Sequence, residues 1–324
     1  MDRSVTPQRN ALAQLELDQA LRAAQRYSKK SRADSTWRAY QSDWRQFEAW
    51  CQRLALASLP ADPETVAMFV ASQADDGRNP STLDRRLAAI RLVHLGAGHP
   101  SPHNALKVVE VMRGIRRDWG QPPVKKTAAL DEDVKKMADA VDPETRKGLR
   151  DRALLLMGFA GAFRRSELVA LNTWNLDTRD EGVKVTIEQS KTDQEAQGQV
   201  IAILKQPESA YCPVQALKDW LTVAEIERGA LFRRMFRFDK VGKQRLTAQS
   251  VALVIKELAF RVGLDPASYA GHSLRSGFLT SAAKNRASVF KMADQSRHKS
   301  LDVLREYVRA EELFEDNAGD GLLK

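Results

Sequence analysis

The stretch GAFRRSEL, residues 161–168, brings an apolar helical segment to an abrupt end at two adjacent arginines. Residues 153–163 are rich in leucine and other apolar side chains, which predicts a buried helix. A guanidinium placed against such a helix end is unfavourable unless an anion accompanies it. Glu167 follows Arg164 closely enough to be that partner. A plainer interpretation is an arginine that interacts only with the helix dipole.

A second stretch, GHSLRSG at residues 271–277, contains His272 and Arg275. Their spacing puts both side chains on one face of a helical turn, so they can act on the same ligand. The arginine can donate hydrogen bonds to an oxyanion while the histidine exchanges a proton. Taken alone, the stretch also fits the capped start of an ordinary helix with an incidental histidine.

Two further signals are weak by themselves. HKSLDVLREY, residues 298–307, runs from His298 to Tyr307, and a tyrosine near a C-terminal helix end is most often part of the core. Residues 183–187 and 199–203 alternate like the strands of a β-hairpin, with Lys191 near its tip. Such a lysine is usually only solvated, and Lys184 and Lys205 are alternatives nearby, although the Ser-Lys-Thr setting favours Lys191.

The chain divides at GQPPVKK, residues 120–126, where two prolines stop a helix and two lysines keep the segment solvated. Residues 35–119 show several helical patterns and no strand pattern, whereas the later part combines helices with the hairpin. We therefore expect an N-terminal arm at 1–30, an all-α domain at 31–119, a linker at 120–128 and a larger α+β domain at 129–324.

Composition favours a polyanionic partner. The formal net charge is +9 and the pI about 9.6, which suggests nucleic acid before membrane, although a merely basic soluble protein is almost as good an interpretation. Cys51 and Cys212 fall in different expected domains, no Cys/His cluster has zinc spacing, and no apolar run resembles a signal peptide or a membrane span. We expect a cytoplasmic, nucleoid-associated protein without metal or cofactor.

The signals gain weight because they occur together and in a fixed order. Arg164-x-x-Glu167-Leu168, a hairpin lysine, His272-x-x-Arg275, and His298 ahead of Tyr307 resemble the active-site set of the tyrosine recombinase (phage integrase) family. Residues 35–51, which end in Ala-Trp-Cys, resemble the DNA-binding helix of Cre-type site-specific recombinases. The resemblance covers nearly the whole chain, but Cre has tryptophan where this chain has His298.

The resemblance implies a fold and a role for each residue. The fold would be mainly α with a small β-sheet, arranged as a two-domain C-shaped clamp of an all-α core-binding domain and an α+β catalytic domain. Tyr307 would be the nucleophile and Lys191 the acid that protonates the leaving 5′ oxygen. Arg164 and Arg275 would bind the non-bridging oxygens of the scissile phosphate. His298 would also bind the phosphate, and His272 would act as base or hydrogen-bonding partner. Arg165 is an alternative to Arg164, although the Arg-x-Ser-Glu-Leu spacing favours Arg164.

The family reaction would proceed through a 3′-phosphotyrosine and a Holliday junction without metal or ATP. The partner would be a double-stranded DNA site with inverted repeats, bound by a dimer per site and a homotetramer on two sites. Most protein–DNA contacts should go to phosphates, with a few side chains that read bases. The DNA-binding candidates are Arg85, Arg86, Arg116, Arg117, Lys125 and Lys126.

Two other functions compete with recombination. One is related chemistry with a different outcome, as in a type IB topoisomerase or a telomere resolvase. The compact two-domain layout and the Cre-like first domain argue against it. The other is a DNA-binding protein that has kept the fold without catalysis, which has no need of Tyr307.

Overall fold

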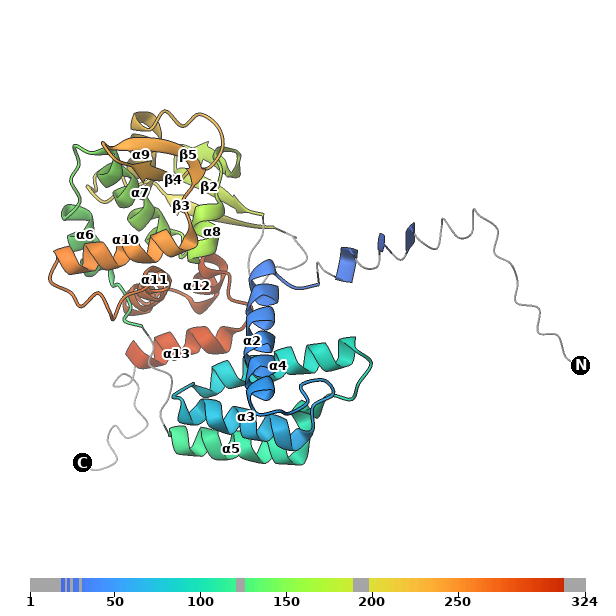
Figure 1. The fold of residues 1–324 in the computed structure, drawn as a ribbon. Coiled ribbons are helices and arrows are strands. Elements are labelled where there is room, and N and C mark those ends of the chain that lie inside the picture. Colours follow the sequence, from blue (N-terminus) through green and yellow to red (C-terminus); the bar gives the residue numbers. More distant parts are fainter. Residues whose placement is uncertain are drawn as a thin grey trace, which may run out of the picture. The chain divides into compact units, whose positions relative to one another are not determined.

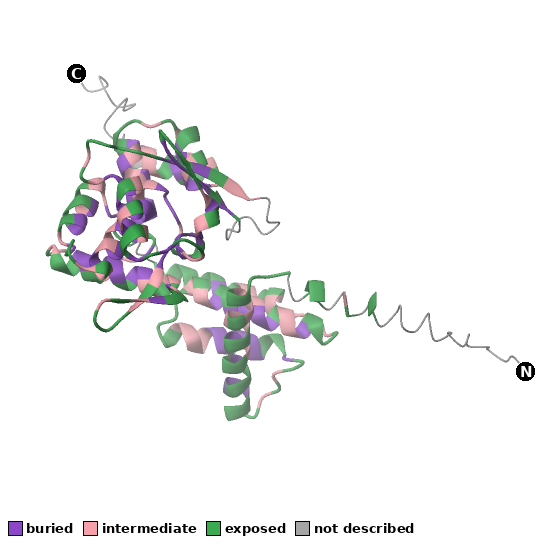
Figure 2. Ribbon diagram, turned by 90° about the horizontal axis from the view of Figure 1, so that it is seen from above, coloured by how far each residue is buried: buried purple, intermediate pink, exposed green. Residues whose placement is uncertain are grey.

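A computed structural model of the protein describes residues 19–20, 22–23, 26–28, 31–120, 126–188 and 198–311, without the side chains of 309–311. The chain separates into two compact units, Met1–Pro123 and Val124–Lys324. Figure 1 traces the helices and strands of the units, and Figure 2 shows that each unit has its own buried interior. Among the described residues, strands occur only in the second unit. A mainly helical fold with small sheets and an all-helical first domain is therefore confirmed.

The first unit is built from helices whose starts are set by proline and asparagine. Proline occupies the first helical position of α3 and α4, where its missing N–H is not needed. Asn79 caps α4 by accepting a hydrogen bond from the Thr82 N–H at 2.9 Å. The described helices are α2 (Asp34–Arg53), α3 (Pro63–Asp75), α4 (Pro80–Gly96) and α5 (Leu106–Trp119), with the 3-10 turn η1 (Pro102–Asn104) before α5.

Aromatic side chains from α2 and α3 form the centre of this unit. The rings of Phe47 and Phe69 meet edge to face with their centroids 5.0 Å apart, and both side chains are fully buried. Ile90 from α4 and Val108 from α5 complete the interior. Because all four helices contribute, the helical patterns of residues 35–119 describe a single packed core.

A polar network lies at one side of this core. The Arg86 guanidinium is 4% exposed and donates hydrogen bonds to Gln73 and, at 2.5 Å, to Gln46. Asp43, which is 1% exposed, lies 3.8 Å from Arg86 Nε and accepts two hydrogen bonds from Arg85, at 2.7 and 3.0 Å. The Asp43 carboxylate is therefore the counter-charge of two adjacent arginines.

The second unit packs helices against one face of a small three-stranded antiparallel sheet. Helix α7 lies in its core, with Leu154, Leu155 and Met157 fully buried. No described helix is long and apolar enough to cross a membrane. The helices are α6 (Asp131–Asp139), α7 (Arg146–Ala160), α8 (Arg165–Ala170), α9 (Pro213–Val223), α10 (Ala248–Arg261), α11 (Ser273–Lys284), α12 (Val289–Ser296) and α13 (Leu301–Glu311), and the 3-10 turn η2 (Thr173–Asn175) follows α8.

The predicted hairpin is confirmed. Strands β2 (Gly182–Ile187) and β3 (Gln199–Leu204) pair antiparallel, and β1 (Leu176–Arg179) adds a third strand beside β2. Val183, Val185 and Ile187 alternate into the core, as their spacing requires. A second hairpin, β4 (Arg233–Phe236) and β5 (Lys240–Arg245), was not anticipated, because its basic residues hide the strand pattern.

Helix α11 carries Arg275 through the interior of this unit, and His272 directly precedes the helix. Its glycine, Gly277, lies against the backbone of Ala129, where an added Cβ would be 1.7 Å from the Ala129 carbonyl oxygen. Ala129 N–H also donates to the Ser273 carbonyl at 2.9 Å. This close approach fixes the position of α11 against the segment that contains Ala129, and it therefore also fixes the position of Arg275 on that helix.

Substitution of Asp43 by alanine should destabilise the first unit strongly, because it leaves the buried Arg86 without its counter-charge. We expect a loss of about 3–5 kcal/mol in the free energy of unfolding, measured by chemical denaturation. Asp84→Ala is the matched control, since Asp84 pairs with Arg116 at the surface and should lose less than about 1 kcal/mol. Equal effects of the two substitutions would contradict the assignment of the network.

Candidate active site

The end of α7 and the start of α8 bring Arg164 and Glu167 together. Arg164 precedes α8, and its own N–H donates to Glu167 Oε2 at 2.9 Å while its Nη1 donates to Oε1 at 2.6 Å. Glu167 is 1% exposed, so its carboxylate depends on these donors. Arg165 instead lies exposed at the surface, and its stem packs against Gly271. Of the two adjacent arginines, Arg164 is therefore the one that belongs to the charged cluster, which consists of Arg164, Glu167, Arg275, Arg297 and His298.

Arg275 lies at the centre of the cluster and is fully buried. Its Nη1 donates to the Ala162 carbonyl at 2.8 Å, and its Nη2 lies 3.4 and 3.5 Å from the two ring nitrogens of His298. His298 Nδ1 is in turn 2.7 Å from Ser296 Oγ, so its ring is held from two sides. Arg275 and His298, distant in sequence, are thus neighbours in the fold.

His272 precedes α11 and keeps an exposed edge. Burial of the rest of the ring, together with the positive charges of Arg275 and Arg164, lowers the pKa of His272 below its ordinary value. The same causes act more strongly on His298, whose pKa falls to about 4. Both imidazoles are therefore neutral at pH 7 and able to accept a proton or to donate one N–H.

Positive charge in this cluster exceeds negative charge. Burial and the charges of Arg164 and Arg297 lower the pKa of Arg275 to about 9, which still leaves it charged at neutral pH. Within the described part of the chain, Glu167 is the one carboxylate that forms ion pairs with these guanidinium groups. An anion placed beside Arg275 would relieve the repulsion, so the cluster has the properties of an anion-binding site.

Tyr307 reaches the same region from α13. It is half-buried against the small apolar cluster of Leu279, Ala283, Met292 and Leu304. Helix α13 packs on both α11 and α12. The phenol is close enough to Arg275 for a phenolate to raise the pKa of that arginine. The candidate nucleophile and the buried guanidinium are therefore within electrostatic range of each other.

The structure describes two of the three candidate lysines near the predicted hairpin. Lys191 falls outside the described residues, in the segment that joins β2 to β3. Lys184 is exposed in the middle of β2, opposite Ala202, and Lys205 is exposed after β3. Lys191 remains an expectation from the sequence.

One DNA-binding candidate requires correction. Arg86 is buried in the polar network of the first unit, so it is not available to enter a DNA groove. Arg85 is half-exposed but held by Asp43, and Arg116 is paired with Asp84 at 2.6 Å. Of the remaining candidates, Arg117 is exposed, Lys126 is exposed and donates to the Ala267 carbonyl at 2.8 Å, and Lys125 lies outside the described residues.

Arg297, which no sequence motif singled out, is also buried in the cluster. Its side chain is 2% exposed, and its Nη2 donates to Glu167 Oε2 at 2.8 Å. The residue also has a left-handed backbone, with φ 59° and ψ 42°. Its one sequence signal is adjacency to His298, because nothing in a sequence distinguishes a buried arginine from a solvated one.

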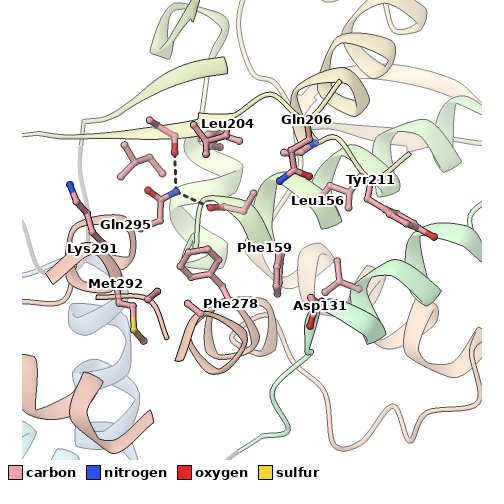
Figure 3. Close-up of a pocket in the computed structure, with 18 of the residues that line it drawn as sticks. Asp131, Leu156, Phe159, Leu204, Gln206, Tyr211, Phe278, Lys291, Met292 and Gln295 are labelled. Atoms are coloured by element: carbon pink, nitrogen blue, oxygen red, sulfur yellow. Dashed lines mark hydrogen bonds between the residues drawn. The ribbon is translucent and has the colours of Figure 1, made fainter. Parts of the chain in front are cut away.

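A large cavity in the second unit does not contain this cluster. It has a volume of about 700 Å³ and is mostly apolar, with walls from α7, β3, α11 and α12 (Figure 3). Gln295 spans one side and donates to the Ala160 carbonyl at 2.8 Å and the Ala202 carbonyl at 3.1 Å. Among the described residues, no three His, Cys, Asp or Glu side chains are grouped to hold a metal ion.

Comparison with known proteins gives matches over both units. Residues 129–313 match the phage integrase family, and residues 25–97 match the N-terminal SAM-like domain of phage integrases. The integrase/recombinase xerD homolog of Selenomonas ruminantium is 41% identical over 298 residues, which cover 91% of this chain and 87% of the relative. The recombinase cre of Escherichia phage P1 is 22% identical, over 86% of this chain and 84% of the relative.

Solved structures share the fold at low sequence identity. The Tn1549 transposon integrase in complex with transposon right end DNA has a TM-score of 0.60 at 13% identity, covering 88% of this chain and 92% of that protein. The lambda integrase dimer bound to a COC′ core site has a TM-score of 0.59 at 15% identity, covering 94% and 82%.

The depressed pKa of His298 predicts a pH-dependent stability. Between about pH 4 and 6.5 the unfolded chain binds a proton at this imidazole that the folded protein does not, so stability is lost as the pH falls through that window. His298→Gln should make the melting temperature, measured by calorimetry without DNA, fall less between pH 6.5 and 4.5. Lys299→Gln, which removes no imidazole, should retain the full slope. Identical slopes for all three proteins would reject this explanation.

Proposed function

This chain belongs to the phage integrase family and is a site-specific DNA recombinase, and we propose that it cuts and rejoins DNA through a covalent bond between Tyr307 and a 3′ phosphate. The observation that supports this most directly is the excess of positive charge around the buried Arg275, with the Tyr307 phenol in electrostatic range of it. A phosphodiester is the anion that fits such a site, since two guanidinium forks match its non-bridging oxygens.

In this proposal Arg164 and Arg275 bind the scissile phosphate. Negative charge grows on its oxygens as Tyr307 attacks phosphorus, and donors already fixed in position stabilise that charge without reorganising. Arg164 is held by Glu167, and Arg275 by the Ala162 carbonyl. Both guanidinium groups are restrained before DNA arrives, so they need not reorganise during the reaction. The stabilisation would be greatest in the transition state, because the negative charge on the phosphate oxygens is greatest there.

The histidines fit the proton and hydrogen-bonding roles. The phenol of Tyr307 must lose its proton, and an ordinary tyrosine pKa near 10 makes this unfavourable at neutral pH. His272 is neutral and partly exposed, so it would accept that proton. His298, held by Ser296, would direct its N–H at a phosphate oxygen. Nearby arginines favour the phenolate and assist the same step.

The leaving group needs a proton of its own. As the bond from phosphorus to the Tyr307 oxygen forms, the bond from phosphorus to the 5′ oxygen breaks, and Lys191 would protonate that oxygen. The phosphotyrosine retains the energy of the broken diester, so attack by a 5′ hydroxyl reseals the strand without ATP. The arginines would supply the charge that a metal ion supplies in other nucleases.

Exchange between two sites would follow from repeated use of this step. We propose that a dimer binds each site through inverted repeats and that a homotetramer on two sites passes through a Holliday junction. The helical domain at 31–119 and the catalytic domain at 129–324 would both contact the duplex. Phosphate contacts would come from exposed cations, with Arg117 and Lys126 as the first candidates, followed by Arg85, Arg116 and Lys125.

Tyr307→Phe should abolish the covalent protein–DNA adduct while leaving DNA binding nearly unchanged, because only the nucleophilic oxygen is removed. The adduct is detected after denaturation of a reaction with a DNA library that carries candidate sites. Tyr269→Phe is the matched control, since that phenol bonds to Asp133 at 3.2 Å and should not be needed for the adduct. Persistence of the adduct in Tyr307→Phe would refute the assignment. Sequence-independent relaxation of DNA by a monomer would favour the topoisomerase alternative.

Affinity for DNA should fall steeply with salt, because phosphate contacts release counterions. For about six such contacts we expect roughly a 1000-fold loss between 50 and 200 mM salt, measured by fluorescence anisotropy. Arg117→Ala should weaken binding to all sequences alike and reduce the salt slope by about one. An affinity that does not respond to salt would exclude a phosphate-bound complex.

A further inference from the structure

We propose that Arg297 is a positioning residue for strand cleavage, which fixes both phosphate-binding arginines through Glu167 and the Ala162 carbonyl. The proposal rests on the function proposed above, because it assumes that Arg164 and Arg275 bind the scissile phosphate.

Arg297 connects the two arginines through shared acceptors. Its Nη2 donates to Glu167 Oε2, while Glu167 Oε1 accepts from Arg164. The same Nη2 lies 2.9 Å from the Ala162 carbonyl oxygen, which also accepts from Arg275 at 2.8 Å. One guanidinium therefore touches the acceptor that orients each phosphate-binding arginine, and its loss would loosen both.

Arg297 itself is not available to the substrate. Its Nη1 donates to the Gly161 carbonyl at 2.9 Å and to the Gln295 carbonyl at 2.6 Å. The side chain is 2% exposed, and its guanidinium carbon lies 5.2 Å from the centre of the Phe163 ring. Both terminal nitrogens are engaged with the protein, so the residue acts through its neighbours and is not a catalytic residue.

The backbone at this point favours glycine, yet an arginine occupies it. Arg297 has φ 59°, and Ala162, whose carbonyl it binds, has φ 43°. Residues with a Cβ adopt this left-handed region at a cost in free energy, and they persist there only when surrounding contacts hold them. The four acceptors of the Arg297 side chain supply such contacts, which indicates that the side chain is the reason for the conformation.

The neighbouring segment ties α12 to α7 in the same way. Gln295 donates to the Ala160 carbonyl at the end of α7, and Arg297 donates to Gly161 and Ala162 directly after it (Figure 3 shows Gln295). His298 follows, with Ser296 against its ring. Residues 295–298 are therefore fixed to the turn that leads from α7 into Arg164.

Removal of Arg297 has an electrostatic consequence. Burial alone would raise the pKa of Glu167, but Arg297 is the strongest of the charges that lower it. Without that charge the pKa rises, and Glu167 becomes protonated at a higher pH. Arg164 then loses its anionic partner, so the acid limb of the cleavage rate should move toward neutral pH.

The decisive experiment compares Arg297→Gly with Arg286→Gly in single-turnover cleavage of a nicked duplex that traps the adduct. Both substitutions relieve a left-handed arginine, since Arg286 has φ 55°, but Arg286 is exposed at the end of α11. We expect Arg297→Gly to cleave on the order of 10- to 100-fold more slowly at pH 7.5, with near-normal DNA affinity. Its acid limb should shift upward, and Arg286→Gly should match the unmodified protein.

Three further measurements separate positioning from a loss of folding. Added methylguanidinium should restore part of the rate of Arg297→Gly and nothing to Arg286→Gly. Arg297→Lys should keep the acid limb in place, because it keeps the charge, yet cleave slowly because a lysine cannot fork between the carbonyls. In a Glu167→Gln background, Arg297→Gly should reduce the cleavage rate by a smaller factor, because part of the influence of Arg297 passes through the Glu167 carboxylate.

Equal rates and equal acid limbs for Arg297→Gly and Arg286→Gly would overturn the proposal. So would a slow Arg297→Gly protein with an unshifted acid limb, no response to methylguanidinium and additivity with Glu167→Gln, since that pattern indicates only damaged packing. An adduct that persists in Tyr307→Phe would instead refute the proposed function, so the two failures are distinguishable.

Discussion

The buried carboxylate of Glu167 is the constraint on which the catalytic unit depends. It is 1% exposed and accepts from Arg164 on one oxygen and from Arg164 N–H and Arg297 on the other. An isolated carboxylate could not remain ionised at such depth, and the arginines could not be packed so closely without it. One anion thus allows several cations to gather at one point while leaving their combined charge in excess, which is the condition for holding a phosphate.

Much of the catalytic unit could be predicted because its signals are local. The Arg164–Glu167 spacing fixes a contact at the start of a helix, and the alternation of Val183, Val185 and Ile187 fixes one face of a strand. The order of the motifs then indicated the family, which the matches over residues 129–313 and 25–97 bear out. Such inferences need only the periods of helix and strand and the geometry of a few side chains.

Other features depended on tertiary context and could not be predicted. Arg85 and Arg86 are adjacent on α4, yet one is half-exposed and the other is buried, because the helix turns about 100° between them. The sequence does not distinguish the two arginines. Their exposure is set by hydrogen bonds to Asp43, Gln46 and Gln73, which come from other helices. Arg297 could not be singled out for the same reason, since its acceptors at Gly161, Ala162 and Glu167 lie more than a hundred residues away.

The carbonyl groups at and directly after the end of α7 make this helix intolerant of insertions as related sequences evolve. Ala160, Gly161 and Ala162 face three side chains, Gln295, Arg297 and Arg275, that reach them from α11 and α12. One residue added between Leu154 and Ala160, inside α7, would rotate those oxygens by about 100° away from their donors. The other end of α7 is held as well, because Asp239 in the β4–β5 turn accepts from the N–H groups of Arg146 and Lys147. The register of α7 therefore cannot shift by even a single residue over evolutionary time without dispersing the charged cluster.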